Sequence, residues 1–223
     1  MSLIEEKFLP ACFDPPWRNR YFEHSETKQT YRFVAGAVAW PGLRPSGFAV
    51  VVGVAVEDHP VKKIPALHCL AEIEEENITK LIFGSVKLRK EYMAREWYGD
   101  VESPNSPFLY SVNKDLQQAE QASFWLIPAY NIKQPGSFSY YARLIGDHLK
   151  ADEKLLFLGD CTRLQGYIEH FPEEAGVKGT PEEFPAIAAL GYAVASLRNY
   201  RPWEYYGQQD PGPTPPLDPF IGY

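Results

Sequence analysis

The sequence predicts an α/β protein in which helices cover both faces of a mixed β-sheet. Three observations support this prediction. Apolar segments with strand composition and short connections occupy 31–39, 48–56 and 64–73. Helical and strand patterns then alternate through 77–200, which is typical of parallel strands joined by crossovers. The chain has 223 residues and 45% hydrophobic residues, so it is long and apolar enough for one domain with its own core.

The first three strands are expected to form an antiparallel meander. Residues 48–56 are almost entirely Val, Ala and Gly, which predicts a central strand that is buried on both faces. Pro41, Gly42 and the Pro-Ser-Gly at 45–47 predict a loop between the first and second strands. His68 lies in the middle of the third strand, where we expect a packed core histidine rather than a metal ligand.

The alternating part begins with a helix over 77–93, for which Asn77 is the expected N-cap. A short strand at 95–100 follows, and the intervening helix predicts that this strand runs parallel to its neighbour. Three antiparallel strands followed by helix, strand, helix and strand is the order of elements of a ribonuclease H-like fold. The later elements are expected at 114–122 (helix), 124–128 (strand), Ser137 to Lys150 (helix, capped by Ser137), 155–158 (strand) and 163–171 (helix).

The last helix has a clear start pattern. Thr180 is a candidate N-cap, Pro181 suits the first helical turn, and Glu183 completes a capping box. Residues 184–197 are almost wholly apolar, so this helix is expected to be buried, with Pro185 kinking its first turn.

Three regions follow from this division of the chain. Residues 31–200 form the predicted ribonuclease H-like domain. Residues 1–30 are rich in turn-forming and aromatic residues and are expected to form an irregular N-terminal arm. Residues 201–223 form a Pro- and Tyr-rich tail, which is expected to be extended, and disordered unless it docks on a protein partner.

Charge and motif content restrict the function classes. The net charge is −7, so the chain has no large basic field that would hold a polyanion non-specifically. P-loop, GxGxxG, HExxH and GxSxG patterns are absent. Cys12, Cys69 and Cys161 have no metal-binding spacing, which predicts reduced thiols in the cytoplasm. Neither a signal peptide nor a membrane-spanning segment is indicated, so the expected location is cytoplasmic, without a membrane partner.

Residues 33–42 and 46–54 form a predicted hairpin around a Gly-containing loop. This hairpin resembles the opening of the nuclease domain of phage terminase large subunits, in which a strand ends in an Asp before such a loop. The helix at 77–93, followed by Trp-Tyr-Gly-Asp at 97–100, is similar to the helix and the strand that ends in a second acid.

The second half continues this resemblance. Residues 182–193 resemble the closing acidic pair and buried helix of the family, in which a third Asp precedes an Ala-Leu step. The resemblance therefore spans roughly 31–200. It implies a DNA endonuclease of the two-metal type, in which clustered carboxylates hold Mg²⁺ or Mn²⁺ ions.

The chain departs from the family at the acids themselves. Ala39 occupies the position matched to the first Asp, and Ala188 the position matched to the last. The resemblance leaves Asp100, Glu182 and Glu183 as candidate metal ligands, of which Asp100 and Glu183 are the candidate catalytic residues. Because alanine has no oxygen to offer a metal ion, we expect cleavage to be lost or weak and no metal cofactor to be needed. The expected role is then binding to phage packaging proteins or to DNA.

The candidate acids also have structural interpretations. Asp100 precedes a Ser-Pro-Asn segment and is in a position to cap a turn. Glu182 and Glu183 lie at a predicted helix start, where acidic residues favour the helix dipole and the capping box.

Two alternatives to a degenerate nuclease remain open. The first is an active Mg²⁺- or Mn²⁺-dependent endonuclease, in which Asp100 and Glu183 converge with one of Glu57, Asp58 or Glu72. The second is an unrelated α/β domain that binds a small molecule, which would lack the antiparallel three-strand start.

Overall fold

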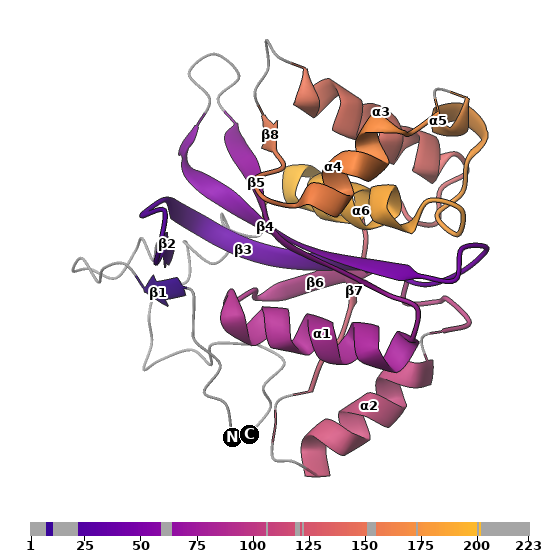
Figure 1. The fold of residues 1–223 in the computed structure, drawn as a ribbon, viewed down its shortest axis with the longest axis horizontal. Coiled ribbons are helices and arrows are strands. Elements are labelled where there is room, and N and C mark those ends of the chain that lie inside the picture. Colours follow the sequence, from indigo (N-terminus) through magenta and orange to yellow (C-terminus); the bar gives the residue numbers. More distant parts are fainter. Residues whose placement is uncertain are drawn as a thin grey trace.

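The fold is described from a computed structural model of the chain (Figure 1). Residues 202–223 of the expected tail at 201–223, Cys12 and most of the expected N-terminal arm lie outside the described residues. The structure describes residues 8–10, 22–58, 64–105, 107–118, 121, 123–150, 155–172, 174–199 and 201.

The centre of the sheet has the strand order β5–β4–β3–β6–β7. Strands β3 (Thr30–Ala39), β4 (Gly47–Asp58) and β5 (Pro65–Glu75) form the antiparallel meander that the sequence predicts. Strand β6 (Glu96–Gly99) lies parallel to β3, and β7 (Ile127–Pro128) lies parallel to β6. This mixed sheet confirms the predicted α/β fold class with ribonuclease H-like strand order.

Three short strands extend the sheet at its edges, and the described residues together form eight strands. Strand β8 (Leu156–Phe157) pairs with β5 in parallel, as a strand at 155–158 would. Strands β1 (Phe8–Pro10) and β2 (Phe22–His24) pair antiparallel next to the start of β3. These two strands differ from the irregular arm expected at 1–30. Each spans three residues, too few for an alternating pattern to be recognisable in the sequence.

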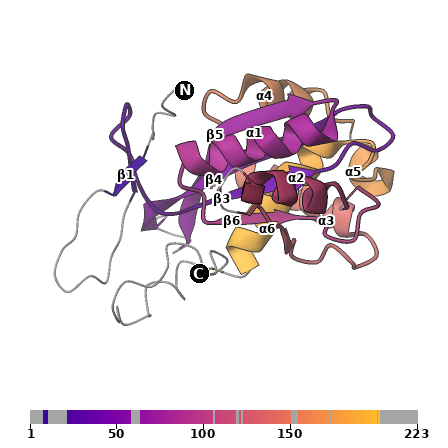
Figure 2. The same cartoon turned by 90° about the horizontal axis from the view of Figure 1, so that it is seen from below.

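The helices form a layer on each face of the sheet (Figure 1). Figure 2, seen from below, shows α1 and α2 in front of the strands. Helices α3, α4 and α6 cover the opposite face, with the short α5 beside them (Figure 1). In no part of the chain that the structure describes is a helix long and apolar enough to cross a membrane. The bounds are Ile78–Glu91 (α1), Pro107–Gln118 (α2), Ser137–Leu149 (α3), Thr162–Glu169 (α4), Ala175–Lys178 (α5) and Pro185–Asn199 (α6).

Alternating residues of β3 divide between the two faces of the sheet. Ala35, Ala37 and Ala39 belong to the core that includes α6, whereas Val34 and Val38 belong to the core under α1. This alternation is the normal side-chain geometry of a strand. The small alanine side chains leave room for α6 to lie close to the middle of the sheet.

Helix α6 is buried on all sides, as its apolar sequence predicts. It packs between the sheet and α3, and a Cβ built at Gly191 would lie 2.4 Å from the Cβ of Tyr141 on α3. Gly191 is therefore required by the close approach of two helices rather than by a turn.

The start of α6 differs from the prediction. The helix begins at Pro185, so this proline occupies the first helical position instead of kinking an earlier turn. Thr180 and Glu183 form a separate turn, in which the N–H groups of Glu183 and Phe184 donate to the Thr180 oxygen at 3.1 and 3.2 Å. Because proline has no N–H to donate, the hydrogen-bonded turn does not continue into the helix.

Three other boundaries were also predicted incorrectly. Ser137 is the first residue of α3, and the cap position is Gly136, whose φ of 75° favours glycine. The strand expected at 124–128 is reduced to β7. The Phe124 N–H donates to Asn113 Oδ1 at 2.6 Å and the Phe124 oxygen accepts from Asn113 Nδ2 at 2.8 Å, so a side chain of α2 replaces a strand partner there. That helix begins at Pro107, seven residues before the predicted start at Lys114.

Candidate functional site

The register of β3 and β6 brings Ala39 and Asp100 to the same end of the sheet. Val38 and Gly99 are register partners in this parallel pair, and Ala39 and Asp100 are the next residues of the two chains. The Trp40 indole Nε1 donates to the Asp100 backbone oxygen at 2.8 Å, which fastens the two strand ends together. This is the sheet end at which the resemblance expects the first two acids.

Helix α6 covers this end of the sheet. Ala188 is fully buried in the core that also contains Ala39, which is 2% exposed. One turn further along α6, Tyr192 is buried close enough to Asp100 to be influenced by its charge. Burial raises the pKa of Tyr192, and the charges of Asp100 and Glu182 raise it further. We call Ala39, Asp100, Ala188 and Tyr192 the sheet-end site.

A second tyrosine adjoins the sheet-end site from α3. The hydroxyl of Tyr141 donates to the Tyr130 backbone oxygen at 2.6 Å, and its ring meets that of Tyr192 edge to face at a centroid distance of 5.3 Å. Burial raises the pKa of Tyr141, with a further contribution from Asp100. Both phenols therefore stay protonated and neutral at ordinary pH, and the site is walled by rings and methyl groups.

Glu182 and Glu183 lie in the turn before α6. The backbone N–H of Arg44 donates to the Glu182 backbone oxygen at 3.1 Å, and this bond joins the turn to the β3–β4 loop. A Cβ at Gly42 would lie 2.5 Å from the Glu182 Cβ, so the two segments are in direct contact. The Glu183 carboxylate accepts from the Thr180 N–H at 3.0 Å, which is the capping-box contact.

Asp100 also has a structural contact. Its Oδ1 accepts from the Glu102 N–H at 2.9 Å, so the carboxylate begins the turn that follows β6. Asn105 ends that turn and donates through Nδ2 to the Pro41 oxygen at 3.0 Å. The turn-capping role suggested by the sequence is therefore present, and it holds Asp100 beside the β3–β4 loop.

The structure directs the other acids considered for a metal site away from Asp100. Asp58 Oδ1 forms an ion pair with Arg32 Nη2 at 3.1 Å. Asp58 and the preceding Glu57 lie at one end of β4, and the register partner of Ala39 lies at the other end. Glu72 accepts from two N–H groups in the first turn of α4, at 2.9 and 2.8 Å. Within the described ranges, no three His, Cys, Asp or Glu residues group so as to hold a metal ion.

The two thiols are buried in the core, and the strand histidine is half-buried. Cys69 and Cys161 are free and buried, and burial raises the pKa of Cys161 to about 12, so neither has the character of a nucleophile. Tyr31 Oη and His68 Nδ1 are 3.2 Å apart, and burial lowers the pKa of His68. His68 thus packs against the rings of Tyr31 and Phe157, and it is half-buried rather than in the core where the sequence predicted it.

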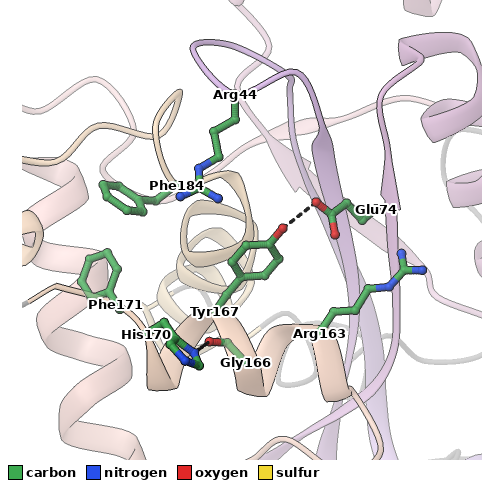
Figure 3. Close-up of a pocket in the computed structure, with 8 residues that line it drawn as sticks. All are labelled: Arg44, Glu74, Arg163, Gly166, Tyr167, His170, Phe171 and Phe184. Atoms are coloured by element: carbon green, nitrogen blue, oxygen red, sulfur yellow. Dashed lines mark hydrogen bonds between the residues drawn. The ribbon is translucent and has the colours of Figure 1, made fainter.

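The sequence did not reveal a pocket on the same helical face, shown in Figure 3. It has a volume of about 410 Å³ and lies between α4, the β3–β4 loop and the turn before α6. We call it the arginine pocket, because Arg44 and Arg163 both line it. A signal was available in α4, since Arg163, Tyr167 and His170 follow one another at helical spacing and therefore share a face.

Comparisons of the chain with models of protein families, with curated proteins and with solved structures gave no match.

Proposed function

We propose that this chain is a phage terminase-like protein with a ribonuclease H-like fold, linked to DNA packaging, in which cleavage is lost or weak. It acts by binding packaging proteins or DNA in the cytoplasm. The proposal is carried by one observation: alanines occupy positions 39 and 188 at the strand end and helix that flank Asp100.

The chemistry of two-metal cleavage supports this proposal. Mg²⁺ requires about six oxygen ligands in octahedral geometry, and two ions need several carboxylates between them. The methyl groups of Ala39 and Ala188 supply none, and burial keeps the nearby hydroxyls of Tyr141 and Tyr192 protonated. A closely packed site of this kind, in which Asp100 is the one carboxylate, gives a divalent cation little compensation for losing its water.

The alternative is an active Mg²⁺- or Mn²⁺-dependent endonuclease that uses Asp100 and Glu183, with Glu182 as a further ligand. One observation favours it, since Asp100 and Glu182 both influence Tyr192 and so lie at the same end of the sheet. The other alternative, an unrelated α/β domain that binds a small molecule, was expected to lack an antiparallel three-strand start. Strands β3, β4 and β5 form such a start, so the fold does not favour this alternative.

Plasmid digestion discriminates between the degenerate and active enzymes. Supercoiled DNA is incubated with the protein and Mn²⁺ or Mg²⁺, and nicked and linear products are measured. We expect no product above background from the wild type. Asp147→Asn, which removes an exposed carboxylate on α3 paired with Lys150, is the matched control for Asp100→Asn. Metal-dependent cutting that Asp100→Asn abolishes and Asp147→Asn preserves would overturn the degenerate site.

Binding is tested separately with a fluorescent DNA duplex at low and physiological salt. A binding role on DNA predicts a saturable increase in anisotropy at both salt concentrations. If the duplex binds only at low salt, the contact is non-specific, and a packaging protein becomes the expected partner.

A further inference from the structure

We propose that the arginine pocket binds a small organic phosphate that carries an aromatic ring, of the size of a nucleoside monophosphate. This site is separate from the sheet-end site and does not depend on the proposed function. It combines a cavity of ligand size, aromatic walls and two arginines that form no ion pair with a described carboxylate.

The cavity is of a suitable size and lining for a small ligand. Its volume of about 410 Å³ lies within the range of small-molecule sites, roughly 300–1,000 Å³. Phe171 and Phe184 meet edge to face at a centroid distance of 5.1 Å and form one wall. Tyr167 forms another, and Phe48 packs against it at 6.0 Å. These rings present apolar surface on which a planar ligand can stack.

Arg44 is held in position by the aromatic walls. Its guanidinium carbon lies 5.8 Å from the ring centroid of Tyr167 and 5.7 Å from that of Phe184. Figure 3 shows its side chain reaching from the β3–β4 loop toward these rings. Cation–π contacts orient a guanidinium without neutralising it, so its N–H donors stay available to an anion.

Arg163 brings a second positive charge to the same pocket from α4. Arg44 and Arg163 both line the pocket, and in Figure 3 their guanidinium groups lie on opposite sides of the Tyr167 hydroxyl and Glu74. Among the ion pairs formed by described residues, none involves either arginine. Two guanidinium groups without carboxylate partners are suited to a phosphate, which carries about −1.5 to −2 charges at neutral pH.

Glu74 is the one carboxylate in the lining, and hydroxyl donors engage it. Its Oε1 accepts from Tyr167 Oη at 2.6 Å and from Ser46 Oγ at 2.7 Å. These bonds orient the Tyr167 ring and leave both arginines outside ion-pair distance of Glu74. The lining therefore carries more positive than negative charge. His170 stands at the rim with its Nδ1 2.8 Å from the Gly166 oxygen, so Nε2 is the ring nitrogen free to meet a ligand.

The size and charge of the chain favour a mononucleotide over a polymer. A net charge of −7 repels a long polyanion, whereas one phosphate meets only the local field of Arg44 and Arg163. The aromatic walls favour a ligand with a ring over inorganic phosphate. An acidic peptide would supply the charge but no ring for Phe171 and Phe184 to stack on.

Isothermal titration calorimetry with the full chain tests this site. AMP is the probe, and adenosine, inorganic phosphate and a dT15 oligonucleotide separate the contributions of ring, phosphate and polymer. We expect AMP to bind more tightly than adenosine or inorganic phosphate by about tenfold or more, because each lacks one half of the recognition. Asp100→Asn is expected to leave the AMP affinity unchanged, since the two regions are separate.

Substitution of the arginines identifies the site. Arg44→Met and Arg163→Met should each weaken AMP binding by about tenfold, because each removes a charge-assisted contact. Arg143→Met, which removes an exposed arginine from α3, should leave the affinity unchanged. All three positions are exposed, and unchanged thermal melting confirms that the variants fold.

Several results would overturn the proposal. These are the absence of AMP binding at millimolar concentration, binding that neither pocket substitution weakens, and inorganic phosphate binding as tightly as AMP. Tighter binding of dT15 than of AMP would identify a single-stranded nucleic acid site and would also contradict the proposal.

Discussion

The sheet-end site and the arginine pocket both lie on the α6 face of the sheet, and they differ in how their polar groups are used. At the sheet end, Ala39 and Ala188 are buried, and the hydroxyl of Tyr141 is bonded to a backbone oxygen. In the pocket, Arg44 and Arg163 are exposed and have no carboxylate partner among the described residues. The first region is packed like a core, and the second has the exposed charges of a binding surface. The position of a family's active site is therefore not always the position at which a chain has charged groups available for a ligand.

The largest expected effect is that of Ala188→Asp, which places a carboxylate in the core of the sheet-end site. Without a metal or a cation, a buried charge of this kind should lower the free energy of unfolding by about 3–5 kcal/mol at pH 7. Burial raises the pKa of such a carboxyl group, so the loss should diminish as the pH falls through that raised value and the group becomes neutral. Urea unfolding at pH 5 and pH 7 measures both effects.

Ala188→Ser is the control, because its hydroxyl can donate to the Phe184 oxygen one turn earlier, as the Ala188 N–H already does at 2.9 Å. Its effect should be much smaller. If Ala188→Asp were as stable as the wild type, Ala188 would not be buried beside the sheet, and the contrast between the two regions would be lost.

The double variant Ala39→Asp, Ala188→Asp restores both carboxylates that the resemblance expects around Asp100. If these positions converge, Mn²⁺ should bind only the folded protein and raise its melting temperature in a concentration-dependent way. Differential scanning calorimetry with and without Mn²⁺ measures the shift, and the wild type should show none. Where the double variant is too unstable to fold, Ala39→Asp alone provides the same comparison. A folded variant without any Mn²⁺ response would show that the three positions do not form a ligand set.

Substitutions of two glycines, one on α6 and one on α3, test how closely these two helices pack against each other. Gly191→Ala places a Cβ 2.4 Å from that of Tyr141, which should cost about 1–3 kcal/mol of unfolding free energy. Gly146→Ala on α3 has no atom within 4 Å of the new Cβ and should stabilise the helix by about 0.5–1 kcal/mol. Chemical denaturation of both variants checks the opposite signs, and equal signs would contradict the close approach of α3 and α6.

A smaller effect is expected at the base of the arginine pocket. Glu72→Gln weakens the two bonds from its carboxylate to the first turn of α4, the helix that carries Arg163 and Tyr167. Loss of a charged cap should cost about 1 kcal/mol in unfolding free energy. Glu75→Gln on the same strand is the matched control and should change little. Equal effects of the two variants in denaturant titrations would contradict the capping role of Glu72.

The smallest effect concerns the buried thiols. In a Cys12→Ser background, Cys69 and Cys161 should react slowly with a thiol reagent at pH 8, because burial excludes the reagent and raises the pKa of Cys161 to about 12. Both should react at once in denaturant. In the unfolded chain the Cys161 thiol loses its proton near its ordinary pKa, whereas in the folded protein it keeps the proton to a higher pH. The free energy of unfolding should therefore fall as the pH rises from about 9 toward 12. Rapid labelling of the native protein would contradict the packed core around α4.

The meander and its helix could be predicted from the sequence because their signals are local. The run at 48–56 is almost entirely Val, Ala and Gly, and Asn77 caps α1 by accepting from the Lys80 N–H at 3.1 Å. The boundary errors arose where a non-local contact replaced the local signal. Phe124 is held by Asn113 of α2, and the first turn of α4 is capped by Glu72 of β5, far away in the sequence. The catalytic and metal roles of Asp100, Glu182 and Glu183 stay predictions.

The sequence by itself determined which segments become strands and helices, because apolar periodicity and capping residues act over one or two turns of chain. It also determined that Ala39 and Ala188 bring no oxygen to their positions. Only the tertiary structure decided that Ala39 ends its strand beside Asp100, and that Arg44 meets Tyr167 and Phe184 around a cavity. These residues are far apart in the chain, and the sheet register and helix packing that join them depend on the whole core forming at once.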